Sequence, residues 1–105
     1  MSAARREKLT LSLPPDPALA GLTQMVTVHF LRQNGVAPHV ARRSARTVKA
    51  RAQVLLKAGA RDAGRGRRAL DLVLTCGGRT LEAVLRSGAA AGPRPLVRLE
   101  RPASA

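Results

Sequence analysis

Residues 38–59, PHVARRSARTVKARAQVLLKAG, combine cations at helical spacing with a complete absence of carboxylates. One sector of a helical wheel contains four cations, which form the basic stripe: Arg42, Arg46, Lys49 and Lys57. The roughly opposite sector is apolar or small: Ala41, Ser44, Ala45, Val48, Ala52 and Leu55. No Asp or Glu lies between Asp16 and Asp62, so the stripe offers anion binding without a carboxylate acid or base. The solvated face of an ordinary amphipathic helix is the commoner interpretation of such a stripe.

The histidines and the cysteine are not spaced for a metal site or a catalytic triad. His29, His39 and Cys76 stand far apart in the sequence, and His29 falls at the margin of an apolar helix face, as a core-flanking histidine would. A single cysteine forms no internal disulfide, which suits a reducing compartment. We therefore expect no catalytic residue, no metal and no cofactor.

The chain is strongly basic, with 19 Lys and Arg against 6 Asp and Glu and a net charge of +13 in 105 residues. Such a charge attracts phosphates, acidic proteins or anionic membranes without selecting among them, and biased base composition in the coding sequence produces the same arginine excess. Phe30 is the single aromatic residue, so few side chains are suited to base stacking. The N-terminus lacks a signal-peptide pattern and no segment is apolar enough to span a membrane, which predicts a cytoplasmic protein without membrane contact.

Two helices must position the stripe. Asp16 followed by Pro17 predicts the start of a first helix that runs to about Asn34, with Gly35 as its stop. Its predicted core face contains four apolar residues: Leu19, Leu22, Val26 and Phe30. Three other apolar residues point elsewhere and are candidates for a contact with a partner: Met25, Val28 and Leu31. The second helix is predicted to begin at Pro38 and to end at Gly59.

Strands are predicted on both sides of the helices. Residues 8–13 alternate apolar and polar side chains, which is typical of a half-buried strand. Residues 70–75 and 80–85 form a predicted hairpin with a Gly77–Gly78 turn, a register that pairs Leu74 with Leu81 and Thr75 with Thr80. Residues 96–99 are a candidate last strand, and residues 60–68 are a connector or, as an alternative, an anion clamp.

These elements predict an α/β (α+β) two-layer sandwich, in which two helices pack on one face of a mainly antiparallel sheet of three to four strands. Residues 8–99 would form this single domain, residues 1–7 a disordered basic arm and residues 100–105 a frayed tail. The residues expected to be buried are Phe30, Val48, Leu55, Leu72, Leu74 and Leu81.

Four segments, KLTLSLPPDPALAGL, FLRQNGV, ARTVKARAQVLL and RALDLVLTCGGRTLEAVLRSG, occur in an order and spacing that resemble a shortened anti-sigma-factor serine kinase of the histidine-kinase-like ATPase (GHKL) superfamily. The resemblance covers about residues 8–92. It implies that the family's catalytic Glu falls on Arg51 and its magnesium-binding Asn on Leu55. The adenine-binding Asp falls on Arg86 by glycine spacing or on Ser87 by strand alternation, with Gly88 matching the first glycine of that motif. A guanidinium cannot act as a base and a leucine offers no oxygen to magnesium, so we expect the ATP site to be lost.

The resemblance therefore implies a pseudokinase, a non-catalytic anti-sigma-factor-like module that regulates transcription through protein–protein binding. Its partner would be a sigma factor or an acidic anti-sigma antagonist, and two copies would associate as a homodimer through the first strand and helix. The basic stripe with Met25, Val28 and Leu31 would form the contact surface. The alternative is an electrostatic, sequence-nonspecific nucleic-acid-binding protein that adds four arginines to the stripe: Arg61, Arg65, Arg67 and Arg68. An active ATP-binding serine kinase is the least supported hypothesis.

Overall fold

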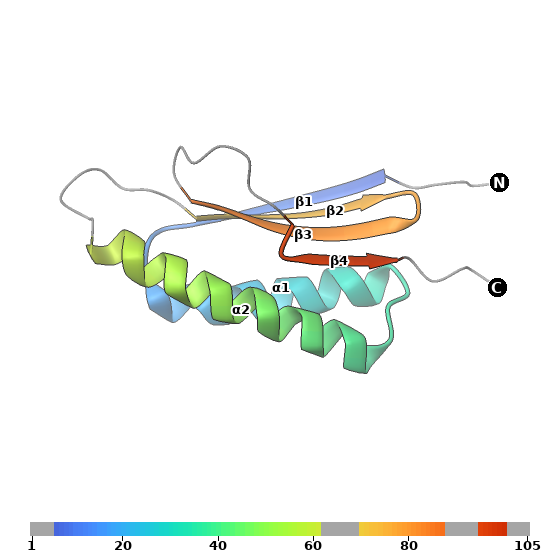
Figure 1. Ribbon diagram of the computed structural model, residues 1–105, viewed down its shortest axis with the longest axis horizontal. Helices are drawn as coiled ribbons and strands as arrows, with labels where there is room; N and C mark the ends of the chain where they lie inside the picture. Colours follow the sequence, from blue (N-terminus) through green and yellow to red (C-terminus); the bar gives the residue numbers. More distant parts are fainter. Residues whose placement is uncertain (1–5, 62–69, 88–94, 101–105) are drawn as a thin grey trace.

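Two helices cover one face of a four-stranded antiparallel sheet in the computed structural model, which describes residues 6–61, 70–87 and 95–100 (Figure 1). The strands lie in sequence order and are β1 (Arg6–Leu13), β2 (Leu70–Gly77), β3 (Thr80–Ser87) and β4 (Val97–Glu100). The helical layer consists of the 3-10 helix η1 (Pro17–Leu19), α1 (Ala20–Gln33) and α2 (Pro38–Arg61). The predicted α+β two-layer sandwich is confirmed.

The ends of the first helix follow the predicted signals. The Asp16 carboxylate accepts a hydrogen bond from the Ala18 backbone N–H at 3.0 Å, and Pro17 opens η1, which leads directly into α1. At the other end Gly35 adopts a φ of 87°, a left-handed conformation that favours glycine and ends the helix. The Asn34 side chain donates to the Phe30 carbonyl at 2.8 Å and so satisfies one of the last carbonyls of α1.

The predicted boundaries of three other elements need correction. The second helix begins at Pro38 as predicted but continues past Gly59 to Arg61, because a single glycine costs a helix only about 1 kcal/mol relative to alanine and does not by itself end it. The first strand begins at Arg6, so the predicted arm of residues 1–7 is shorter, and residues 1–5 lie outside the description. The last strand runs from Val97 to Glu100, one residue later than predicted.

The hairpin turn lies at Gly78 and Arg79, and the predicted Gly77–Gly78 turn is wrong. Gly77 pairs with Thr80, and among the turn residues Gly78 alone has a positive φ, 67°, the pattern of a type II′ turn with glycine at its first central position. Leu74 therefore pairs with Ala83 and Thr75 with Glu82. Moving the turn by one residue changes every partner by two, so the predicted faces of both strands stay correct.

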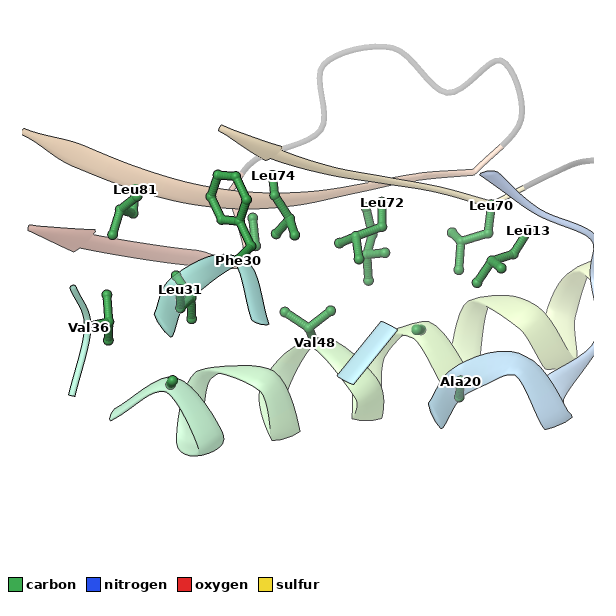
Figure 2. Close-up of a cluster of buried hydrophobic side chains, with 14 of the residues drawn as sticks. Leu13, Ala20, Phe30, Leu31, Val36, Val48, Leu70, Leu72, Leu74 and Leu81 are labelled. Atoms are coloured by element: carbon green, nitrogen blue, oxygen red, sulfur yellow. The ribbon is translucent and has the colours of Figure 1, made fainter. Parts of the chain in front are cut away.

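The core lies between the helices and the leucine-rich face of the sheet. Figure 2 shows Val48 of α2 directed toward the sheet, where Leu72 and Leu74 lie, and Phe30 of α1 beside them. The predicted burial is confirmed for Phe30, Val48, Leu72, Leu74 and Leu81. Leu55 is the exception, because it is half-buried at the margin of the core while its neighbour Leu56 is 1% exposed.

The opposite face of the sheet, called the open face below, is covered by neither described helix and carries mostly polar side chains around the apolar pair Val73 and Val84, of which Val73 is 7% exposed. Strand alternation places Lys8, Thr10 and Ser12 of β1 on this face, while Leu9, Leu11 and Leu13 lie on the helix side. Two side-chain contacts link neighbouring strands across it. The Ser12 hydroxyl donates to the Asp71 carboxylate at 2.6 Å, and the Arg98 guanidinium lies 3.6 Å from the Glu82 carboxylate.

Candidate functional site

The basic stripe lies on the side of α2 that faces away from the sheet. Arg42, Arg46 and Lys57 are exposed and Lys49 is half-buried, while Val48 on the opposite side of the helix is fully buried. From Arg42 to Lys57 the helix rises about 22 Å, so the stripe runs along most of α2. None of these four side chains forms a hydrogen bond or ion pair with another residue of the described part of the chain.

Charge is divided unequally between the two layers. The helices α1 and α2 contain no Asp or Glu, and α2 carries Arg43 and Arg51 in addition to the stripe. Among the strand residues whose side chains are described, strand alternation places three cations and three carboxylates on the open face: Lys8, Arg86, Arg98, Asp71, Glu82 and Glu100. The positive field of the described residues therefore originates in the helical layer, and the open face of the sheet is close to neutral.

The three residues of the predicted apolar contact patch on α1 differ in exposure. Met25 is 69% exposed and is available to a partner. Val28 is half-buried, and Leu31 is 4% exposed and belongs to the core, so Leu31 is removed from the patch. The error has a physical cause, since α1 buries Thr23 and Thr27 completely, and this turns the helix away from the face that its larger apolar residues predicted.

Two residues predicted for the core face of α1 also move outward. Leu22 is 41% exposed, and His29, expected at the edge of the core, is exposed as well. Leu19 and Val26 are partly buried against the core, as their predicted face requires. The buried face of α1 thus consists of Ala20, Thr23, Thr27, Phe30 and Leu31.

An exposed apolar residue that the sequence analysis missed lies beside the stripe. Val54 of α2 is 55% exposed, and residues three or four positions apart on a helix are surface neighbours, so Val54 lies next to Lys57 and the exposed Ala50. The sequence could have identified Val54, because Val54 is an apolar residue within the polar sector of the helical wheel of α2. Together Met25, Val54 and the stripe form the outer surface of the helical layer, which we name the outer helical surface.

The positions that the resemblance assigns to nucleotide chemistry do not come together. Arg51 is exposed on α2, and Leu55, one turn later, packs against the core. Arg86 pairs with Asp71 on the open face of the sheet, so the sheet separates it from α2. Ser87 ends β3 opposite Leu70, its side chain lies outside the description, and Gly88 lies outside the described residues. Of the four arginines that the nucleic-acid alternative adds to the stripe, Arg65, Arg67 and Arg68 also lie outside the described residues, as does the side chain of Arg61.

The two histidines and the cysteine differ in exposure and lie on different elements. His29 and His39 are exposed, Cys76 is buried, and no group of three or more His, Cys, Asp or Glu side chains among the described residues is placed to hold a metal ion. An open hollow of about 510 Å³ lies at the hairpin end of the sheet, lined in part by Lys8, Glu82 and Arg98. The Arg98–Glu82 ion pair joins two of these side chains, which neutralise each other.

No protein-family model matches the chain, and no curated protein matches it. Among the helices that the structure describes, none combines the length and the apolar character needed to cross a lipid bilayer. The functional interpretation therefore depends on the outer helical surface, where exposed apolar side chains occur together with cations that pair with none of the described residues.

Proposed function

We propose that this chain is a non-catalytic, anti-sigma-factor-like regulatory module that binds another protein through its outer helical surface. The observation that carries the proposal is that the outer helical surface combines the exposed apolar residues Met25 and Val54 with four cations that have no ion-pair partner among the described residues. Protein interfaces are enriched in Met and Arg and combine an apolar centre with a polar rim. The resemblance adds the class of partner, a sigma factor or an acidic anti-sigma antagonist, which would place the module in the cytoplasm.

Loss of nucleotide chemistry is the second part of the proposal. The exposed guanidinium of Arg51 cannot take a proton from water, and the half-buried Leu55 offers an apolar side chain where a magnesium ligand is required. Arg86 on the other face of the sheet supplies no carboxylate for an adenine amino group. The module would thus act by binding its partner and not by phosphoryl transfer.

Self-association through β1 and α1, which the resemblance implies, is compatible with the exposed surface at that edge. The strand β1 pairs with β2 alone among the described strands, and Leu9 is 36% and Leu22 41% exposed. An edge strand with nearby exposed apolar side chains is suited to association with a second copy. Leu22 lies three positions before Met25 on α1, so this association would use a part of α1 next to the outer helical surface.

Sequence-nonspecific binding of nucleic acid is the second candidate function. The concentration of unpaired cations in one layer favours it, because phosphate contacts require positive charge and little else. Protein–DNA interfaces are, however, more polar than protein–protein interfaces, and an exposed Met25 adds nothing to phosphate binding. The two functions therefore differ in their dependence on Met25.

Affinity capture from the native cell, with and without nuclease, tests the proposal. We expect a protein partner that survives nuclease treatment, is lost with the double charge reversal Arg42→Glu and Arg46→Glu, and dissociates faster from Met25→Ser. Arg79→Glu in the hairpin turn is the charge control, and it should retain the partner. Recovery of nucleic acid alone, unaffected by Met25→Ser, would favour the second candidate and overturn the proposal.

A further inference from the structure

We propose that the outer helical surface recognises an acidic amphipathic α-helix that lies along α2. The inference rests on the proposed function and adds the chemistry and the conformation of the segment that the partner presents. It depends on three observations: the spacing of the cations, the absence of carboxylates from both helices, and the position of the exposed apolar side chains.

The spacing of the stripe matches a helix better than an extended strand. Along the axis of α2 the steps from Arg42 to Arg46, to Lys49 and to Lys57 are about 6, 4.5 and 12 Å. A partner helix repeats these steps with acidic residues four, seven and fifteen positions after the first, because both helices have the same rise per residue. Residues on one face of an extended strand recur every ~6.6 Å, and they fall out of step with the cations after the first pair.

The absence of internal partners makes these cations available to an external anion. No carboxylate lies on α1 or α2, and the four side chains of the stripe make no hydrogen bond or ion pair with the other described residues. An acidic helix would therefore form new ion pairs without breaking existing ones. At a partly desolvated interface such pairs contribute more to association rate and partner choice than to affinity.

The apolar side chains supply the contacts that simple charge attraction lacks. With the sheet on one side of α2 and α1 beside it (Figure 1), the right-handed turn of α2 puts the stripe on the flank toward α1 and Val54 on the other flank. Met25 is 69% exposed on α1, so each helix presents one exposed apolar side chain on the outer helical surface. A docked helix would place its acidic residues on the stripe and apolar residues on Met25 and Val54, at the usual interhelical distance of about 8–10 Å.

The test uses three synthetic peptides of about 18 residues, enough for the length of the stripe. The first is helical and has Glu at the four matched positions with Leu beside them, the second is helical with the same composition in scrambled order, and the third keeps the matched order but contains two central prolines that prevent a helix. Fluorescence anisotropy with the full chain at near-physiological salt measures each affinity. We expect the matched helix to bind about tenfold more tightly than either control.

Variants of the protein then locate the contact. Arg46→Glu with Lys49→Glu should weaken the matched peptide about tenfold, chiefly through slower association, and Met25→Ser should raise its dissociation rate several-fold. Arg79→Glu with Lys8→Glu, which changes the net charge equally at the sheet, should change the affinity less than about twofold.

Two outcomes overturn the inference. Equal affinity for the matched and scrambled peptides would show nonspecific charge attraction, and equal affinity for the proline peptide would show recognition of an extended segment. Either result leaves the proposed function intact if affinity capture recovers a nuclease-resistant protein. If the chain instead prefers duplex DNA to every peptide and Met25→Ser has no effect, the proposed function itself fails.

Discussion

Two adjacent leucines on α2 provide a sharp test of the structure. Leu56 is 1% exposed within the core, whereas Leu55 is half-buried at its margin. Replacing a buried Leu by Ala removes three carbons from the core. At ~0.8 kcal/mol for each buried CH2 group, this loss of burial lowers the unfolding free energy by about 2.4 kcal/mol. The cavity left behind raises the loss of unfolding free energy for Leu56→Ala to about 3–4 kcal/mol. The half-exposed Leu55 should lose only about 1 kcal/mol on the same change.

Thermal and urea unfolding followed by circular dichroism measures both losses. For a domain of this size, 1 kcal/mol shifts the Tm by about 4 °C, so we expect decreases of about 12–16 °C for Leu56→Ala and ~4 °C for Leu55→Ala. Val54→Ala is the matched surface control, and its Tm should change by less than ~2 °C because Val54 is 55% exposed.

The comparison also tests the orientation of α2 about its axis. Equal losses, or a larger loss for Leu55→Ala than for Leu56→Ala, would refute the placement of Leu56 in the core. Leu55 would then fill the centre of the space in which the resemblance expects a nucleotide. A small loss for both variants would show that α2 does not pack on the sheet as described.

The hairpin, the helix interface and the nucleotide positions give three more predictions. Gly78→Ala should lower the unfolding free energy by about 1–2 kcal/mol because Gly78 has a positive φ. Gly77→Ala is the control and should change the unfolding free energy little. A larger loss for Gly77→Ala than for Gly78→Ala in urea melts would favour the Gly77–Gly78 turn. Thr27→Val should leave the urea midpoint unchanged or raise it, since the buried Thr27 hydroxyl has no hydrogen-bond partner among the described residues, and a loss above ~1 kcal/mol would contradict this. The matched change Thr23→Val should cost about 1 kcal/mol, because the Thr23 hydroxyl donates to the Ala20 carbonyl at 2.6 Å. Millimolar Mg-ATP should raise the Tm no more than pyrophosphate does, and a nucleotide-specific rise that disappears in Arg51→Ala would argue for a functional ATP site.

Local signals in the sequence predicted the order and the type of the main elements. Asp16 with Pro17 and Gly35 mark the ends of the first helix because capping and positive φ depend on residues next to each other in the chain. The leucines of β2 and β3 identify the buried face of the hairpin because side chains alternate strictly along a strand. These features need no knowledge of the rest of the fold.

Features that depend on packing between elements were predicted less well. The burial of Thr23 and Thr27 follows from the close approach of α1 to the alanines of α2, and hydrophobicity alone ranks Leu22 above either threonine. A wheel of α2 accommodates Leu55 or Leu56 in its apolar sector, and the contact with the sheet decides between them. The wheel predicted the exposure of Arg42, Arg46 and Lys57, whereas the exposure expected for Leu31 was wrong because Leu31 packs in the core.

The pairing of β1 with β2 has a consequence for the order in which the chain folds. Ser12 and Asp71, joined across these strands, are 59 positions apart in the sequence, and both helices lie between them. On the ribosome, β1 therefore emerges long before its partner, while the α1–α2 hairpin forms from contacts that are local. The two helices would therefore pack on each other when β1 is the only strand that has been synthesised. The apolar side chains of β1 would lack their sheet partner until β2 has been synthesised, so β1 would stay exposed to aggregation for longer than β2 and β3, which follow each other directly in the chain.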